Sequence, residues 1–232
     1  MILDDLWAAY AAHVPYARTF EKLASASLQN DHVAFRSRKL EPIARAFEGL
    51  GWRRAGTYDF PDTHLNAIHL TKPGSPRIFV SELREEAFSP RLRELLARLP
   101  EDPPFDGSAA WFKKPDVLFT ESELLELEQE SQYAAWIALF GREVNHFTAS
   151  VPDVELWQKR MSEAGIPMKS EIEGAPGAKF RQTATKAAPR KVKLADKERE
   201  WPYAYLEIAQ RAEGFDGFIP HQARQLFDMT RR

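Results

Sequence analysis

Two short stretches of the sequence, Asn30–Ser37 (NDHVAFRS) and Val144–Val151 (VNHFTASV), share one pattern although they are far apart in the chain. In each, a histidine directly follows a short polar residue and begins an apolar run. These histidines are His32 and His146. Short apolar runs of this composition are typical of β-strands. The same strand therefore occurs twice, each time with a histidine near its start.

A helix and a terminal glycine follow each of these strands at the same distance. His32 and Gly51 are 19 positions apart, and so are His146 and Gly165. The residues between them have the apolar spacing of an amphipathic helix, and glycine often ends a helix. A match of strand, helix, glycine and histidine at one spacing predicts a duplicated structural unit.

Further strands are expected in both copies. In the first copy they fall at residues 52–60, 65–70 and 77–83, separated by turns rich in proline. In the second copy they fall at residues 179–187 and 201–210. We therefore predict an α+β fold in which two βαβββ modules pair to form a half-open barrel.

The whole chain is expected to form one domain around this pair of modules. Its predicted segments are N-terminal helices (1–28), a first module (29–83), a helical insert (84–141), a second module (142–211) and a C-terminal segment (212–232). Thr120 and Glu123 form a capping-box pattern, which predicts that the main helix of the insert begins at Thr120 and continues to Gly141.

The composition limits the kinds of function. The 232 residues carry a formal net charge of −2, which gives no general attraction to nucleic acid or to an anionic membrane. The basic stretch Lys179–Arg199 lacks interleaved aromatic residues and is interpreted as a solvated surface. Because there is no cysteine, a metal would need His, Asp or Glu ligands. The chain has neither a signal-peptide pattern nor an apolar run of ~20 residues, so we expect a cytoplasmic protein that acts on a small molecule.

The two histidines would approach each other if the modules pack about a pseudo-twofold axis. Glu207 is the best third ligand, because it lies within an apolar predicted strand, where an unpaired carboxylate is costly. His32, His146 and Glu207 would then form the two-histidine, one-carboxylate set of non-haem Fe(II) sites. A strand histidine is more often a hydrogen-bonded core residue than a ligand. From the pattern alone, a metal site and a structural role both stay open.

Four residues are candidates for substrate binding. Side chains alternate along a strand, so Arg36 and Ser150 share faces with the two histidines. His69 lies on a neighbouring predicted strand, where a role in the core is the alternative. Arg211 follows the candidate carboxylate by four residues, and a surface ion pair is its alternative. The other histidines, His13, His64 and His221, are interpreted as structural or surface residues.

Several separated motifs resemble the 2-oxoadipate dioxygenase/decarboxylase family, also called hydroxyglutarate synthases. They are NDHVAFRS, GWRRAGTYDFPDTHLNAIHL, PRIFVSEL, NHFT and YLEIAQRAEGFDGF, and together they cover most of the chain. The family belongs to the vicinal oxygen chelate superfamily of paired βαβββ modules. The resemblance implies that His32, His146 and Glu207 hold Fe(II), or another divalent metal in the purified protein. It also implies that Arg36 is a catalytic residue that binds the substrate carboxylate.

The resemblance further implies an activity in lysine catabolism. A 2-oxo dicarboxylic acid such as 2-oxoadipate would chelate Fe(II), react with O2, release CO2 and become a 2-hydroxy acid such as 2-hydroxyglutarate. The chain is shorter than the best-known members of the family, so substrate contacts from a later C-terminal region are not carried over.

Two other functions fit the same fold. A metal-dependent isomerase or lyase similar to glyoxalase I would need a second carboxylate. Glu82 is the candidate, and Ser81 competes with it for the inward position. A non-catalytic protein that binds a small molecule would hold no metal tightly. Uptake of O2 with a 2-oxo acid distinguishes the dioxygenase from both alternatives.

Overall fold

The computed structural model describes residues 2–219 and residue 230 of the chain. The rest of the predicted C-terminal segment, including His221, lies outside the described residues. The helices are α1 (Ile2–Ala11), α2 (Pro15–Ala24), α3 (Leu40–Gly49), α4 (Pro90–Leu96), α5 (Glu121–Glu130), α6 (Gln132–Phe140) and α7 (Val154–Glu163), with short 3₁₀ turns η1 (Pro61–Thr63), η2 (Glu85–Ala87) and η3 (Ala109–Trp111). The strands are β1 (Asn30–Ser37), β2 (Arg53–Phe60), β3 (Leu65–Thr71), β4 (Arg77–Leu83), β5 (Val144–Ser150), β6 (Phe180–Ala184), β7 (Ala188–Lys193) and β8 (Glu198–Arg211). None of the helices among these residues is long and apolar enough to cross a membrane.

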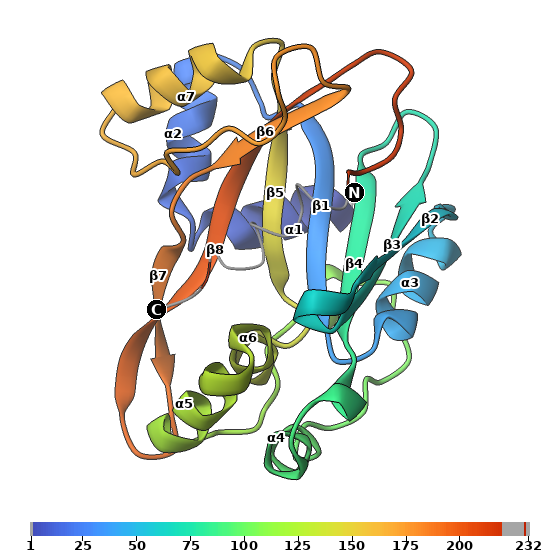
Figure 1. Cartoon of the computed structure of the whole chain (residues 1–232), viewed down its shortest axis with the longest axis vertical. Helices are drawn as coiled ribbons and strands as arrows, with labels where there is room; N and C mark the ends of the chain where they lie inside the picture. The colour runs from blue at the N-terminus through green and yellow to red at the C-terminus, as the bar shows by residue number, and fades with distance from the viewer. Residues whose placement is uncertain (1, 220–229, 231–232) are drawn as a thin grey trace.

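The strands form one open sheet through the centre of the molecule (Figure 1). Its order is β2-β3-β4-β1-β5-β8-β6, and β7 pairs with β8 beside this path. The two histidine strands, β1 and β5, are antiparallel neighbours at the junction of the two modules. Each has a parallel partner within its own module, β4 for β1 and β8 for β5. This arrangement confirms the predicted α+β fold of two paired modules.

The predicted helix-ending glycines have the expected conformation. Gly51 after α3 has φ +95°, and Gly165 after α7 has φ +79°. Side chains with a Cβ rarely adopt these values, so glycine is favoured at both positions. Both helices therefore end where the duplicated pattern predicts.

The second module departs from the first at its outer edge. The expected strand over residues 179–187 is shorter, and it is followed by β7 after a break. Pairing with the long β8 continues across this break, because the backbone N–H of Thr185 donates to the carbonyl of Leu206. The counterpart of β2 is reduced, within the described residues, to isolated bridges at Met168 and Glu173. The intervening stretch includes prolines and glycines, Pro167, Gly174, Pro176 and Gly177, which disfavour a regular edge strand.

The stretch of the insert from Thr120 to Gly141 contains two helices where one was predicted. The capping box of Thr120 and Glu123 is present, and α5 begins there. The single helix to Gly141 was wrong, because Ser131 is extended (φ −155°, ψ 110°) and its hydroxyl accepts a hydrogen bond from the backbone N–H of Ala134. Serine favours this capping conformation over a helix interior. The chain therefore turns at Ser131, and the apolar helix α6 is buried against the sheet.

One face of strands β1 and β5 packs against helices, and the other face carries the two histidines. Phe35 of β1 packs on Phe47 of α3, with ring centroids 5.5 Å apart. Phe147 of β5 packs on Trp7 and Tyr10 of α1, at 5.1 Å from each. Full burial of one such aromatic side chain stabilises the fold by about 1.5–3 kcal/mol. Because side chains alternate, these contacts direct the neighbouring histidines to the other face of the sheet.

Candidate metal centre

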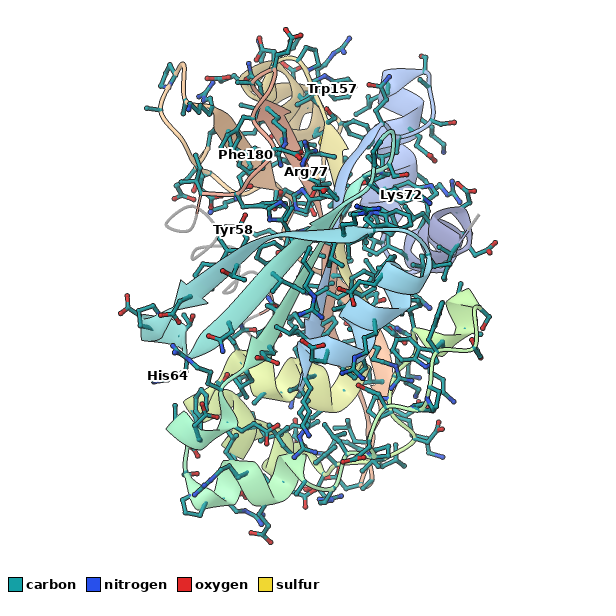
Figure 2. All side chains as sticks on the ribbon, turned by 90° about the vertical axis from the view of Figure 1, so that its right-hand side faces the viewer. Tyr58, His64, Lys72, Arg77, Trp157 and Phe180 are labelled. Atoms are coloured by element: carbon teal, nitrogen blue, oxygen red, sulfur yellow. The ribbon has the colours of Figure 1, made fainter. Side chains whose placement is uncertain are left out.

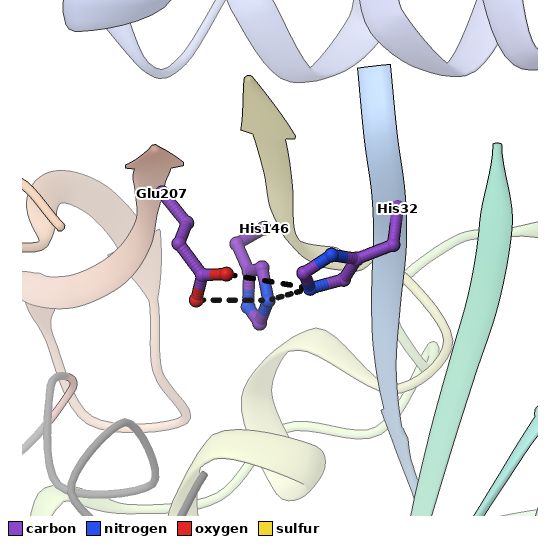
Figure 3. Close-up of side chains that lie close together, drawn as sticks. All are labelled: His32, His146 and Glu207. Carbon is purple, nitrogen blue, oxygen red and sulfur yellow. Dashed lines mark hydrogen bonds and ion pairs between the residues drawn. The ribbon is translucent and has the colours of Figure 1, made fainter. Parts of the chain in front are cut away.

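Three donor side chains from three strands meet in the interior of the protein. Nε2 of His32 on β1 lies 3.4 Å from Nε2 of His146 on β5. Oε1 of Glu207 on β8 lies 3.5 Å from the first nitrogen, and Oε2 lies 3.7 Å from the second (Figure 3). All three residues are buried. Within the part of the chain that the structure describes, this is the only group of His, Asp or Glu placed closely enough to hold a metal ion.

The register of the sheet produces this meeting. His32 pairs with Thr148 of β5, and Thr148 pairs with Glu207 of β8. His32, Thr148 and Glu207 thus form a row across the three strands, and their side chains point to the same face of the sheet. The Thr148 hydroxyl donates to Oε1 of Glu207 at 3.2 Å and lies 3.1 Å from Nε2 of His32. No role was predicted for Thr148, because the register between strands cannot be read from their order along the chain.

A β-bulge precedes each histidine. The pairing of β1 with β5 skips Asp31 on one strand and Asn145 on the other. Such bulges redirect a side chain, and here each skipped residue turns back to the adjacent histidine. Oδ1 of Asp31 lies 2.8 Å from Nδ1 of His32, and Oδ1 of Asn145 lies 3.0 Å from Nδ1 of His146. The short polar residue before each histidine was the sequence signal for these contacts, although no role was predicted for it.

The Nδ1 contacts orient the ring nitrogens. An ionised carboxylate and an amide oxygen only accept hydrogen bonds, so Nδ1 carries the hydrogen in both rings and Nε2 has a lone pair directed inward. Burial raises the pKa of Asp31, but hydrogen bonds from Arg211 and His32 outweigh it and hold that pKa well below its ordinary value. Asp31 is therefore ionised and can accept from both partners.

The donor atoms fit a bound cation. Oε2 of Glu207 is buried and accepts no hydrogen bond within the described residues. Burial raises the pKa of Glu207 well above its ordinary value and lowers the pKa of His146 well below its own. Burial also lowers the pKa of His32, against the opposing effect of Asp31. Two neutral imidazoles beside a carboxylate with an unsatisfied oxygen can together bind one divalent metal ion.

His32 and His146 line one end of a cavity, and the carboxyl group of Glu207 lies beside their Nε2 atoms. Phe79, Phe180 and Phe218 form the apolar wall of this cavity. Arg36 lines the same cavity, four residues beyond His32 on the same strand face, which corresponds to about 13 Å along the strand. The cavity therefore has candidate metal-binding atoms at one end and a positively charged side chain at the other.

The guanidinium group of Arg36 is held firmly. It donates to the Thr230 hydroxyl at 2.8 Å and to Oε1 of Gln132 at 3.2 Å. It also lies over the rings of Tyr133 and Trp136, at 5.3 and 5.5 Å from their centroids. Helix α6 thus supplies a fixed setting for this charge, as expected for a side chain that orients an anion.

Comparison with known proteins shows the family of this chain. A family model for 2-oxoadipate dioxygenase/decarboxylase matches residues 6–104 and 105–230. The chain belongs to this family. The match confirms the resemblance predicted from the separated motifs.

Individual relatives show how far the similarity extends. The chain is 26% identical over 220 residues to the chloroplastic 2-oxoadipate dioxygenase/decarboxylase of Arabidopsis thaliana, covering 78% of this chain and 58% of that protein. The chain therefore spans little more than half the length of this relative. The hydroxyglutarate synthase of Oryza sativa, solved in complex with 2-oxoadipate, has a TM-score of 0.85 at 22% identity, covering 100% of this chain and 91% of that one. A glyoxalase superfamily protein of Ralstonia eutropha has a TM-score of 0.82 at 23% identity, covering 92% and 83%. These two structures show a shared fold.

Three predicted substrate-binding residues lie away from the wall of the cavity. Ser150 is exposed at the end of β5, because this strand extends past the cavity. His69 lies behind Phe218, with ring centroids 5.4 Å apart, and its Nδ1 is 2.8 Å from the Tyr58 hydroxyl. Arg211 forms a bidentate ion pair with Asp31, so its guanidinium lies behind His32 rather than in the cavity. Of the substrate-binding candidates, only Arg36 lines the cavity among the described residues.

The histidines interpreted as structural are also located. His13 is exposed and His64 is half-exposed. His64 lies at the end of the sheet away from Arg77 and Phe180 (Figure 2). The basic stretch of the second module carries ion pairs, such as Lys191 with Glu198, in line with a solvated surface.

The second carboxylate required by the isomerase alternative is not in the cavity. Oε2 of Glu82 accepts a hydrogen bond from the backbone N–H of Leu40 at the start of α3. Ser81 takes the inward position instead. By register, the counterpart of Glu207 in the first module is Phe79, because Ala34 pairs with Phe79 as Thr148 pairs with Glu207. The two modules thus supply three donor side chains and one apolar side chain.

Proposed function

We propose that this protein is an Fe(II)-dependent dioxygenase and decarboxylase that converts a 2-oxo dicarboxylic acid of the 2-oxoadipate type to a 2-hydroxy acid. In this reaction C1 leaves as CO2, one atom of O2 enters the new carboxylate at C2, and the other becomes the hydroxyl group. The observation that supports it best is the cavity lined by His32 and His146 at one end, with Glu207 beside them, and by Arg36 at the other end.

The donor set supports the choice of metal. His32, His146 and Glu207 would hold the ion through two neutral nitrogens and one oxygen, a set typical of Fe(II) oxygenases. When bound, Fe(II) supplies open positions for the 2-oxo acid and for O2, and the redox chemistry of decarboxylation. The chain contributes the fixed directions of the donor atoms, because Asp31 and Asn145 hold the two imidazole rings.

Arg36 would bind the far carboxylate of the substrate. Its planar guanidinium can donate two parallel hydrogen bonds to a carboxylate, and such a pair fixes the direction of the substrate chain. Gln132 and Thr230 already hold this group in place, so less freedom is lost on binding. A dicarboxylic acid would therefore lie along the cavity with its 2-oxo end at the metal centre.

The apolar wall would exclude water from the reacting end. The ring of Phe218 lies 4.8 Å from the ring of His32, and Phe180 and Phe79 pack beside it. A dry cavity strengthens charge–charge interactions with the bound anion and limits side reactions with solvent.

The same structure gives less support to the other functions. A second metal-binding carboxylate, as a glyoxalase-like site would need, is replaced by Phe79. A non-catalytic binding protein would have no reason to bury a carboxylate oxygen without a hydrogen bond, as at Glu207.

The experiment is anaerobic reconstitution with Fe(II), followed by addition of O2 and 2-oxoadipate. We expect O2 uptake, CO2 release and formation of the 2-hydroxy acid in equal amounts. The matched control substrate is 2-oxohexanoate, which keeps the 2-oxo end but lacks the far carboxylate and should react poorly. An iron-loaded protein that consumes no O2 with any 2-oxo acid would contradict the proposal.

A further inference from the structure

An ion pair joins the two outer strands of the metal centre. Nε of Arg211 lies 2.7 Å from Oδ2 of Asp31, and its terminal nitrogen NH2 lies 2.8 Å from Oδ1. Both side chains are deeply buried, with exposed fractions of 8% and 4%. Asp31 directly precedes His32 on β1, and Arg211 follows Glu207 on β8. Strand β5 lies between β1 and β8, so the pair links two strands that are not neighbours in the sheet.

The Asp31 carboxylate is shared between the arginine and a candidate ligand. Its Oδ1 is 2.8 Å from NH2 of Arg211 and 2.8 Å from Nδ1 of His32. A carboxylate held on two sides has little freedom to rotate, so the ring that donates to it is fixed as well. The position of Arg211 therefore sets the direction of Nε2 of His32.

The arginine itself is fixed by its surroundings. Its NH1 donates to the carbonyl of Gly217, and its guanidinium lies 4.3 Å from the ring centroid of Phe180 and 5.2 Å from that of Phe218. These contacts occupy both edges and a face of the group. Arg211 is therefore not placed to bind a substrate anion in the cavity.

The second histidine has no equivalent ion pair. Asn145 offers His146 a neutral amide oxygen, and the amide nitrogen of Asn145 makes no hydrogen bond within the described residues. A carboxylate behind an imidazole increases its basicity more than a neutral amide does. His32 and His146 thus occupy equivalent positions in the fold, but Nδ1 of His32 faces a charged carboxylate and Nδ1 of His146 faces a neutral amide.

We propose that Arg211 is a positioning residue of the metal centre, which acts through Asp31 to fix His32 as the stronger of the two imidazole ligands. The inference rests on the proposed function only in that the three donor side chains bind a metal. In this role Arg211 neither binds the substrate nor forms a surface ion pair.

The test measures Co(II) affinity by calorimetry and the visible absorption spectrum of the Co(II)-loaded protein. Arg211→Gln should weaken Co(II) binding about 10–100-fold and shift the spectrum, because outer contacts of this kind tune a ligand by such factors. Arg211→Lys should restore little of the loss, since lysine cannot make the bidentate contact.

The matched control is Arg181→Gln on the adjacent strand β6. Arg181 is equally buried and pairs with Glu155, but it lies away from the three donor atoms. This variant should lose thermal stability without a change in Co(II) affinity or spectrum. An equal loss of affinity in Arg181→Gln and Arg211→Gln would assign the effect to general destabilisation and overturn the inference.

A double variant covers the case in which Arg211→Gln fails to fold. Asp31→Asn/Arg211→Gln leaves no buried charge without a partner and makes the first copy resemble Asn145 in the second. If the two residues act as one unit, the double variant should bind Co(II) no more weakly than Asp31→Asn alone. Wild-type protein that binds no metal would overturn the proposed function. If Arg211→Gln or the double variant binds Co(II) as tightly as the wild-type protein does, only this inference is overturned.

Discussion

Nε2 of His32 lies 3.4 Å from Nε2 of His146, although 114 positions separate the two residues in the chain. The antiparallel pairing of β1 with β5 brings them together, because Ala34 lies opposite His146 and its small side chain leaves room for both rings. Both Nε2 atoms lie beside the carboxyl group of Glu207, so one divalent cation between them would be bound by all three donors. The relationship between the two histidines is therefore the most direct structural evidence for a metal centre.

Removal of either histidine should abolish tight metal binding. We expect the wild-type protein to bind one divalent ion per chain, and His32→Ala and His146→Ala each to lower the affinity by more than ~100-fold, since removing a ligand costs more than removing its outer partner. Equilibrium dialysis with Mn(II) followed by metal analysis measures this. His64→Ala is the control, because His64 is half-exposed and distant from the centre. Full occupancy in either ligand variant would remove that histidine from the site.

Replacement of Arg36 by lysine should separate substrate binding from metal binding. Lysine keeps the positive charge but lacks the planar fork, so we expect Arg36→Lys to bind metal normally and to lose ~10–100-fold in kcat/KM for 2-oxoadipate, the effect of hydrogen bonds to a charged group. Arg38→Lys, two residues away and paired with Glu85, is the matched control. Unchanged kinetics in Arg36→Lys would place the substrate carboxylate elsewhere.

The fold and the three donor residues could be predicted because they depend on patterns within single strands. The repeated histidine strand, the helix that follows it and its terminal glycine are local features, and a duplicated unit predicts that the two copies pack together. Glu207 stood out for the same reason, since a carboxylate in an apolar strand is costly without a partner.

The surroundings of the donors could not be predicted because they depend on register and on bulges. Asp31 and Asn145 face their histidines only because the pairing of β1 with β5 skips one residue on each strand. Simple alternation of side chains along β5 could not show that the strand extends beyond the cavity, where Ser150 is exposed. The buried ion pair of Arg211 could not be predicted, because its partner, Asp31, lies 180 positions earlier in the chain.

The buried His69 should make the protein less stable in acid. Burial lowers the pKa of His69 to about 4, below the value of about 6.5 in the unfolded chain. The unfolded state therefore takes up a proton first as the pH falls, so stability is complete above about 6.5 and is lost progressively down to about 4. Between pH 7.5 and 5 this group alone should cost about 2 kcal/mol of unfolding free energy.

The pH dependence of urea unfolding tests this directly. The difference in unfolding free energy between pH 7.5 and pH 5 should be smaller in His69→Gln than in the wild type, while His64→Gln should resemble the wild type. The other buried histidines contribute to both proteins and cancel in the comparison. Equal differences in His69→Gln and wild type would mean that His69 is not protonated on unfolding.

Glu207→Gln distinguishes a ligand from a buried structural carboxylate. Glutamine keeps the shape and the hydrogen bond from Thr148 but removes the charge, and burial already disfavours the ionised form, as the raised pKa of Glu207 indicates. We expect the metal-free variant to be at least as stable as the wild type, because no buried ion pair is broken. If Glu207 is a ligand, the same variant should bind Fe(II) weakly and release little or no CO2 from 2-oxoadipate. Thermal unfolding without metal, together with metal affinity and CO2 release, measures the three quantities.

Glu173→Gln provides the matched comparison, because Glu173 is also a buried carboxylate of the second module. Its Oε1 pairs with Lys169 and its Oε2 accepts from Gln182, so loss of its charge removes a buried ion pair. This variant should lose stability, by about 3–5 kcal/mol for a fully buried pair, but it should change metal affinity much less than Glu207→Gln does, because Glu173 acts on Glu207 only through its charge. The opposite pattern is expected for Glu207, where stability is kept and metal binding is lost. A Glu207→Gln protein with unchanged metal affinity and activity would show that two histidines suffice without this carboxylate, and the three-donor centre would be wrong.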